Sequence, residues 1–356
     1  MCYDYLAEGG VPISAQIAMD LRQLIFGTAA ISMRAEWTQT PFLFGPAKVD
    51  LAYGLRSPRN ATRGLLSVVQ GFVLKYLLFG RRHALNPDDD LQKEALVMAF
   101  VEILLLVADK GKVKIVLPAA ADEEAFVAHS VNYFHDSITE KLYIFTLSTR
   151  SDLMTFLRRH LKNFTAEDQP GTLLFLYSAV LTRTLGKVRL DLDSKLSMPL
   201  TMINNDEGSL MIVTLLLTGR ATPYIHNGVL NVGDDDSYSM PQYGILNRCT
   251  IGLLIWDNEV TQASALMVRQ PGSRLKTPNH PIWITSCAGH YGVIFSRNSD
   301  LLRNYHAEAH FELNYYSCSG HQIAMTIDNR AHTTVERRDM LVQQQSFVGY
   351  GERRVY

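Results

Sequence analysis

The residues best placed to do chemistry lie in a polar loop, residues 53–64, that leads directly into an apolar segment. Cysteine hydrolases place a nucleophile at such a junction, because the positive end of the helix dipole and its free amides lower a thiol's pKa and stabilise an oxyanion. Here the junction carries Thr62 and Arg63. An arginine at a helix N-terminus opposes the dipole and has no nucleophilic atom. The junction therefore has the setting of a thiol hydrolase without its nucleophile.

The four cysteines offer no clear replacement. Thiolate attack requires a cysteine within hydrogen-bond reach of a base, and the cysteine closest in sequence to this junction is Cys2. Cys287 is nearest to His290, but it ends a predicted strand instead of opening a helix. Cys249 and Cys318 are predicted to be structural thiols. On the residues alone, His290 is more often a hydrogen-bonded structural residue than a base.

No residue pattern predicts a metal ion, and no cofactor is expected. The histidines His306, His310 and His321 lack a helical or strand spacing suited to metal ligation. The acidic run Asp234–Asp236 lacks the further ligands of a calcium loop, so a solvated loop is the preferred interpretation.

Helix signals dominate the front half of the chain. Ser14 is a candidate N-cap, and the three aspartates of residues 88–90 suit a helix N-terminus. Helices are predicted over residues 14–25, from 64 through the apolar run to about 79, from 88 to about 110, and over 151–164, 170–185 and 207–218, the last ended by Gly219. Strands are predicted at 112–117 and 142–147.

The C-terminal third changes character. Strand-like segments are predicted over residues 281–286, 290–295, 309–316 and 322–327, with turn-forming residues between them. A mostly helical front half joined to an antiparallel back half indicates an α+β fold.

Composition excludes several classes of function. Apolar residues make up 47% of the 356 and charged residues 19%, as in globular proteins. With 34 Lys and Arg against 35 Asp and Glu, the net charge is −1, which gives no general attraction to nucleic acid or to an anionic membrane. We therefore expect no nucleic-acid and no membrane partner.

The expected compartment is intracellular, either cytoplasmic or nuclear. The apolar stretch of residues 95–108 is too short for a bilayer and contains Glu102, and residues 1–10 have no basic region followed by an apolar one. Four scattered cysteines do not form the framework of a disulfide-rich secreted protein.

Several motifs together resemble the MINDY family of deubiquitinases, which are cysteine hydrolases selective for lysine-48-linked ubiquitin chains. The matching segments run in the family's order and are residues 64–70 (GLLSVVQ), 73–79 (VLKYLLF), 215–221 (LLLTGRA), 275–278 (LKTP), 281–284 (PIWI) and 289–295 (GHYGVIF). The resemblance covers roughly residues 45 to 330 and is greatest to the third and fourth subgroups. It implies a papain-like cysteine-protease arrangement, in which a central helix packs on the C-terminal antiparallel sheet.

The resemblance also implies which site residues differ. Active members begin the central helix with Gly-Gly-Pro-Cys-Gly and carry an oxyanion glutamine six residues before the cysteine. Aligning residues 64–70 with the family's Gly-Val-Leu-Ala-Ala-Val-Gln puts Arg63 at the nucleophile position and Ser57 at the glutamine position. His290 matches the family's catalytic histidine. The chain therefore resembles the inactive paralogue of the fourth subgroup, a pseudoenzyme.

The resulting prediction is a single domain over 1–356, with a helical lead-in at 1–45, the region of resemblance at 46–330 and a tail at 331–356. Its expected function is that of an inactive ubiquitin carboxyl-terminal hydrolase that binds ubiquitin or lysine-48-linked polyubiquitin, or that regulates an active relative. One alternative is an active deubiquitinase with a displaced nucleophile. A further alternative is an interaction protein without ubiquitin binding.

Overall fold

The computed structural model describes residues 9–57, 59–80, 84–167, 169–192, 198–201, 209–232, 240–256 and 270–330. The α-helices are α1 (Ala15–Phe26), α2 (Ala35–Thr38), α3 (Arg63–Phe79), α4 (Asp89–Ala108), α5 (Arg150–His160), α6 (Lys162–Thr165), α7 (Gly171–Arg183), α8 (Leu185–Asp191), α9 (Leu210–Thr218) and α10 (Ser273–Lys276). Short 3-10 helices are η1 (Thr139–Lys141), η2 (Ser299–Leu302) and η3 (Tyr305–Glu308).

Twelve strands lie within the described residues, in four sheets. They are β1 (Val11–Pro12), β2 (Leu43–Phe44), β3 (Leu55–Arg56), β4 (Val113–Pro118), β5 (Leu142–Leu147), β6 (Val229–Val232), β7 (Met240–Tyr243), β8 (Gly252–Trp256), β9 (Ile282–Cys287), β10 (His290–Phe295), β11 (His310–Tyr316) and β12 (Gln322–Asp328). The largest sheet has the order β12-β11-β10-β9-β8, and a smaller one has the order β1-β5-β4.

Local capping signals set several helix ends as predicted. The Ser14 side chain accepts a hydrogen bond from the Ile17 amide at the start of α1, and Asp88 accepts one from Leu91 at the start of α4. Helix α9 ends at Gly219, whose φ of 80° is in the left-handed region that glycine adopts without a Cβ clash. These three predicted boundaries are confirmed.

Two predicted helices are divided. The segment 151–164 forms α5 and α6, with Leu161 between them in αR backbone, so the break is slight. The segment 170–185 ends as α7 at Arg183, because Thr184 has a φ of 74° and starts a new helix, α8, by accepting a hydrogen bond from the Lys187 amide.

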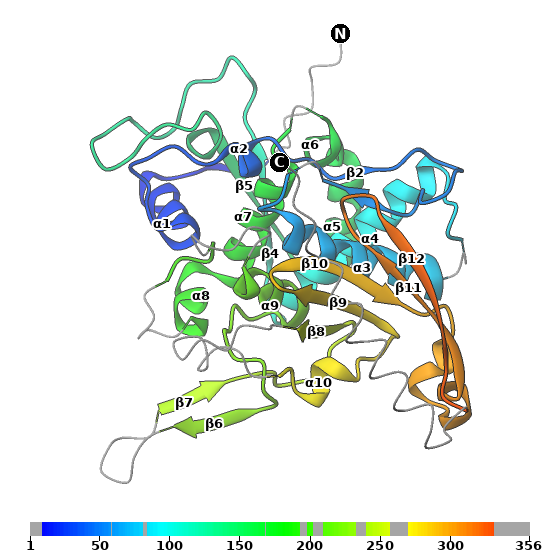
Figure 1. Ribbon diagram of the computed structural model, residues 1–356. Helices are drawn as coiled ribbons and strands as arrows, with labels where there is room; N and C mark the ends of the chain where they lie inside the picture. The colour runs from blue at the N-terminus through cyan, green and yellow to red at the C-terminus, as the bar shows by residue number, and fades with distance from the viewer. Residues whose placement is uncertain are drawn as a thin grey trace, which may run out of the picture.

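The α+β class is confirmed: helices dominate the front half and the five-stranded sheet occupies the C-terminal third (Figure 1). The sheet is antiparallel except at one edge, where β8 pairs parallel to β9. That parallel strand was not predicted, because its partner lies beyond a long connection.

Helix α3 forms the junction between the helices and this sheet. All but a few of its residues are buried, and it packs on α4 and α9 as well as on β9 and β10 (Figure 1). Gly71 permits a close approach, because a Cβ there would lie 2.6 Å from Ile251 Cδ1 and 3.1 Å from Ile284 Cδ1. The predicted central helix on the C-terminal sheet is therefore present.

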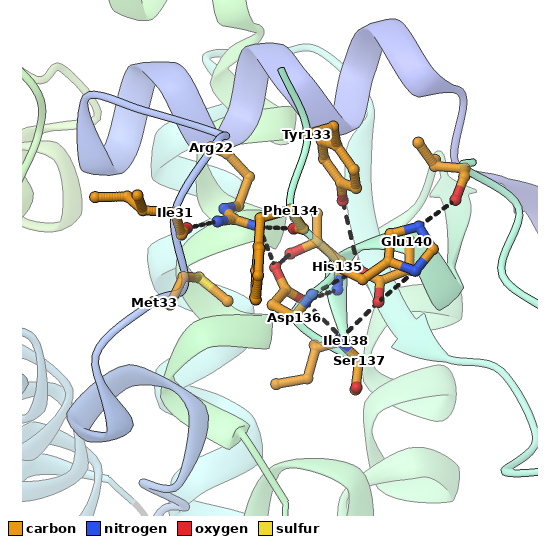
Figure 2. Close-up of polar contacts among 12 residues, drawn as sticks. Arg22, Ile31, Met33, Tyr133, Phe134, His135, Asp136, Ser137, Ile138 and Glu140 are labelled. Carbon is orange, nitrogen blue, oxygen red and sulfur yellow. Dashed lines mark hydrogen bonds and ion pairs between the residues drawn. The ribbon is translucent and has the colours of Figure 1, made fainter. Parts of the chain in front are cut away.

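A buried charged network fixes the segment between β4 and β5 against α1 (Figure 2). Arg22 is fully buried and donates to Asp136 Oδ2 at 2.7 Å and to the carbonyl oxygens of Phe134, at 2.9 Å, and Ile31. Asp136 also accepts hydrogen bonds from the amide and the hydroxyl of Thr139. The guanidinium thus joins two loops that are far apart in sequence.

A second carboxylate completes this network. Glu140 is almost fully buried and accepts from the Ser137 amide at 2.7 Å and the Asp136 amide at 3.2 Å. His135 lies beside it, with Nδ1 4.0 Å from Glu140 Oε1 and Nε2 2.8 Å from the Val127 carbonyl oxygen. Figure 2 shows the Asp136 carboxylate bonded to the Arg22 guanidinium, and the Glu140 carboxylate bonded to the Ser137 amide beside His135.

No helix among the described residues is long and apolar enough to cross a bilayer.

Candidate functional site

The loop that precedes α3 is held by a buried amide. Gln70, one of the few polar residues in α3, has an exposed fraction of 0%. Its Oε1 accepts from the Leu55 amide at 2.6 Å, and its Nε2 donates to the Tyr53 carbonyl oxygen at 3.0 Å. The amide oxygen and the amide nitrogen of Gln70 therefore both bond to backbone groups of the loop. These two bonds fix the loop relative to α3.

The sheet holds the same loop from the other side. The Tyr316 hydroxyl, at the end of β11, donates to the Leu55 carbonyl oxygen at 3.0 Å. Gly54 is required at this contact, because a Cβ there would lie 2.2 Å from the Tyr316 hydroxyl oxygen and 2.4 to 2.8 Å from two atoms of its ring. Tyr53 packs edge-on against both Tyr316 and Phe295, and burial raises its pKa to about 12. The loop therefore packs, through Tyr53, on the aromatic rings of Tyr316 and Phe295.

Ser57, the residue predicted at the oxyanion position, is 3% exposed and bonded within its own loop. Its hydroxyl donates to the Arg59 carbonyl oxygen at 2.7 Å and accepts from the Arg59 amide at 3.2 Å. Its amide donates to the Cys318 carbonyl oxygen at 2.8 Å, in the turn between β11 and β12. The hydroxyl is therefore used to shape the loop.

Arg63, the residue predicted at the nucleophile position, is the first residue of α3 and is half-buried. Its amide donates to the Asn60 carbonyl oxygen at 2.9 Å. The preceding Thr62 is fully buried, and the first turn contains no acidic residue. An arginine therefore stands at the first position of α3, at the positive end of the helix dipole.

His290, the residue predicted at the base position, is exposed at the start of β10. It pairs with Cys287 across a two-residue turn formed by Ala288 and Gly289, whose φ angles of 48° and 82° are typical of a tight hairpin. Tyr291, next along the strand, is buried. Because side chains alternate along a strand, His290 and Cys287 share the face opposite to Tyr291.

The three predicted site residues lie toward one end of the five-stranded sheet. Val293 pairs with Tyr316, so the chain after Tyr316 continues toward Cys318 alongside Tyr291. Ser57 is bonded to Cys318, and the Ser67 hydroxyl, one turn into α3, is 4.0 Å from the Cys318 sulfur. The turn that contains Cys318 therefore contacts both the Ser57 loop and the first part of α3. His290 lies opposite Cys287 in the β9–β10 hairpin.

Comparison with known proteins identifies the family. The sequence matches the conserved domain of the deubiquitinating enzymes MINDY-3/4 over residues 22–347, most of the chain. The chain belongs to the MINDY-3/4 deubiquitinase family. The MINDY match begins at residue 22, inside the segment that we expected to be a lead-in, and the resemblance read from the motifs is confirmed.

Individual MINDY relatives agree with this assignment. The mouse protein named probable ubiquitin carboxyl-terminal hydrolase MINDY-4 is 30% identical over 328 residues, which is 89% of this chain and 42% of the relative. Its bovine counterpart is 31% identical over 92% of this chain and 42% of the relative. Human ubiquitin carboxyl-terminal hydrolase MINDY-3 is 25% identical over 81% of this chain and 67% of the relative.

This MINDY chain spans about two fifths of the length of the MINDY-4 relatives. No solved structure matches it.

The cysteines of this MINDY chain have different surroundings. Cys249 is 5% exposed, and burial raises its pKa to about 12, which disfavours the thiolate. Cys318 is buried behind the Ser57 loop, and Cys287 is exposed. Cys2, Asp234–Asp236 and the 331–356 tail lie outside the described residues.

No group of three or more His, Cys, Asp or Glu side chains in the described part of the chain is arranged to hold a metal ion.

The residues that hold the loop were missed by the sequence analysis. One signal was available: Gln70 interrupts a run of apolar side chains in a helix predicted to be buried, and a buried amide needs partners. Tyr316 and Cys318 gave no comparable signal, because their contacts with the loop are defined only by the folded sheet.

The Tyr316 hydroxyl is expected to stabilise the loop measurably. Tyr316→Phe leaves the Leu55 carbonyl oxygen without this buried donor, so the free energy of unfolding should fall by about 1–3 kcal/mol. Denaturant titration measures the change. Tyr305→Phe is the matched control, because Tyr305 is 81% exposed and should change stability by less than about 0.5 kcal/mol. Equal effects of the two variants would contradict this role of Tyr316.

Proposed function

We propose that this chain binds ubiquitin or lysine-48-linked ubiquitin chains without cleaving them, as an inactive ubiquitin carboxyl-terminal hydrolase. The observation that carries the proposal is at the start of α3. The helix begins with Arg63 where the family resemblance implies the nucleophile, and the Ser57 hydroxyl is bonded to Arg59 instead of being directed at a substrate. Thiol chemistry has no attacking atom at that position.

The scaffold around this position supports retained recognition. The loop is fixed by Gln70 and Tyr316, and α3 packs closely on β9 through Gly71. The relatives are named ubiquitin carboxyl-terminal hydrolases, which supports ubiquitin as the partner. Of the three positions predicted to do chemistry, Arg63 and Ser57 depart from the family pattern, whereas His290 matches it.

Arg63 gives the proposed ubiquitin-binding site, at the start of α3, a specific property. The C-terminal tail of ubiquitin ends in a carboxylate, and a guanidinium at a helix N-terminus forms charge-assisted hydrogen bonds with such a group. The same side chain would alternatively obstruct the tail. Comparing the ubiquitin affinity of the parent with that of an Arg63 variant distinguishes the two roles: the affinity falls if Arg63 pairs with the tail and rises if Arg63 obstructs it.

A second candidate is an active deubiquitinase with a displaced nucleophile, and one observation favours it. Cys287 is exposed and lies directly opposite His290 in the β9–β10 hairpin, so a thiol and an imidazole share one face. Cys287 ends a strand, however, and has no helix dipole to favour its thiolate. Only this candidate requires Cys287 to be nucleophilic.

The proposed binding predicts amide shifts in isotopically labelled ubiquitin chains titrated with this protein. We expect weak, saturable binding with a Kd of about 0.1 mM, equivalent to about −5.5 kcal/mol. Monoubiquitin and lysine-48-linked tetra-ubiquitin are compared by the same measurement. Absence of shifts at millimolar protein would remove ubiquitin binding and leave the interaction protein as the remaining interpretation.

Two arginine variants test whether the ubiquitin tail binds at the start of α3. Arg63→Ala removes the guanidinium at the helix start, whereas Arg59→Ala removes one from the preceding loop, where Arg59 is bonded to Gln39. A change confined to Arg63→Ala, in either direction, places the ubiquitin tail at α3. Equal changes in both variants would indicate general charge attraction and count against a tail site.

A further inference from the structure

The buried network between α1 and the loop of residues 119–138 has an imbalance of charge. The side chains of Arg22, Asp136 and Glu140 have exposed fractions of 0%, 2% and 2%. Arg22 Nη1 lies 2.7 Å from Asp136 Oδ2, and one guanidinium cannot neutralise two carboxylates. Because a buried charge without a counter-charge is costly, a second positive group beside Glu140 would stabilise the network.

Hydrogen bonds favour the charged form of both carboxyl groups. Glu140 accepts from the Ser137 amide at 2.7 Å, the Asp136 amide at 3.2 Å and the Tyr133 hydroxyl at 3.5 Å. Asp136 accepts from the amide of Thr139 at 2.6 Å and from its hydroxyl at 2.7 Å. All of these partners are donors, and donors stabilise a carboxylate more than a neutral carboxylic acid.

His135 is placed to supply the second positive charge (Figure 2). Its Nδ1 is 4.0 Å from Glu140 Oε1, and its Nε2 is 2.8 Å from the Val127 carbonyl oxygen. A carbonyl oxygen only accepts, so Nε2 carries the hydrogen. In the neutral ring Nδ1 then presents a lone pair to the carboxylate, whereas in the imidazolium it presents an N–H. Both contacts therefore fit the protonated ring, and only one fits the neutral ring.

Other titratable and charged side chains surround His135 in the described part of the chain. They are Arg22 of α1, Glu140 and Lys141 of η1, Tyr177 of α7, and His129, Tyr133 and Asp136 of the loop itself. Burial raises the pKa of Tyr133 and of Tyr177, so both hydroxyls stay neutral at physiological pH.

The two nearby basic side chains are poorly placed to balance Glu140. Lys141 Nζ is 3.5 Å from the Ala121 carbonyl oxygen, to which it donates. His129 is exposed, and its ring centroid lies 5.4 Å from that of His135, so a proton on His129 would repel one on His135. The geometry therefore favours His135 as the counter-charge of Glu140.

The same network sets the position of side chains on the surface of the loop. The Phe134 amide donates to the Ala29 carbonyl oxygen at 2.8 Å, and the Phe134 carbonyl oxygen accepts from Arg22 at 2.9 Å. Phe134 is 42% exposed and Val131 is 93% exposed. The placement of two exposed apolar side chains thus depends on how firmly the loop is held.

We propose that His135 is a pH-sensitive latch, whose protonation fastens the loop of residues 119–138 to α1 and whose deprotonation loosens it. Histidine ordinarily titrates near pH 6.5, whereas carboxyl groups titrate near pH 4 and stay charged over this range. The fastened loop favours the protonated ring, so the added stability is present at about pH 6 and is lost as the pH rises towards about 8.

Hydrogen exchange followed by mass spectrometry tests the latch in the full chain. After correction for the intrinsic pH dependence of exchange, peptides from residues 128–138 should be about threefold more protected at about pH 6 than at about pH 8, as for a partly exposed ion pair. Peptides from α4, which contains no histidine, report the global effect of pH. That effect has the opposite sign at His160 and His280, because burial lowers the pKa of each and their protonation opposes folding.

His135→Gln is the decisive variant. Its amide can donate to the Val127 carbonyl oxygen but carries no charge, so loop protection at pH 6 should fall to the value at pH 8. His129→Gln is the matched control, because it removes a neighbouring imidazole that is exposed, and it should keep the threefold difference. An unchanged circular dichroism spectrum verifies that both variants fold.

Three outcomes would overturn the proposal. The first is equal loop protection at the two pH values in the parent. The second is a pH dependence that His135→Gln leaves intact, and the third is one that His129→Gln abolishes, because another side chain would then be the titrating group. If His135→Gln does not fold, the pH dependence of the parent and of His129→Gln still decides between the first and third outcomes and the latch.

Discussion

Incubation of the purified chain with lysine-48-linked tetra-ubiquitin is expected to release no shorter chains above the uncatalysed background. Loss of a hydrolase nucleophile lowers the rate by about six orders of magnitude. The family resemblance puts Arg63 at the nucleophile position, and the Ser57 hydroxyl is hydrogen-bonded to the Arg59 backbone. Gel analysis over a day at micromolar protein measures the result.

Two further experiments, a cysteine substitution at Arg63 and a thiol-reactive ubiquitin probe, test the same prediction. Arg63→Cys should remain inactive, because positioning errors of about 1 Å cost about a hundredfold and Ser57 offers no oxyanion donor. A ubiquitin-vinyl electrophile should likewise form no adduct with the parent. Cleavage or labelling that Cys287→Ala abolishes would establish the displaced nucleophile and reject the pseudoenzyme.

Asp136→Ala should destabilise the fold strongly. It removes the partner of the fully buried Arg22, whose guanidinium then has no counter-charge at 2.7 Å. Removing one member of a buried pair costs about 3–5 kcal/mol, a large part of the stability of a typical domain. Denaturant titration measures the free energy of unfolding.

An exposed pair provides the control for this prediction. Glu94 accepts two hydrogen bonds from Arg158 at the surface, where water screens the ion pair. Glu94→Gln should cost less than about 1 kcal/mol. If Asp136→Ala costs no more than that, solvent reaches Arg22 and the network does not fix the loop as described.

The parts of the fold predicted from sequence are those set by local chemistry. Ser14, Asp88 and Gly219 define helix ends through bonds that span three or four residues. The parallel pairing of β8 with β9 was not predictable in this way, because it depends on residues about thirty positions apart that meet only in the folded sheet. The positive φ of Thr184 was not predictable either, because β-branched residues rarely adopt this backbone conformation.

The same division holds at the candidate site. The polar loop and the buried helix were predicted from their composition, and the roles of Arg63, Ser57 and His290 from family resemblance; those roles remain predictions. The hydrogen bond from Tyr316 that holds the loop was not predicted, because Tyr316 and Leu55 are 261 residues apart in the sequence. Strand alternation, which separates His290 from Tyr291, required the register of β9 and β10.

The hydrogen bonds of Ser57 have a consequence for evolutionary reversibility. A glutamine at this buried position would need additional volume and would remove the hydroxyl that orders Arg59, at a cost of about 1–3 kcal/mol. Under the proposed function, Ser57→Gln alone would therefore lower stability while yielding no activity, since Arg63 would still occupy the position that the family resemblance gives to the thiol. Selection would then act against this single change, so a return to catalysis would need changes at both Ser57 and Arg63 together.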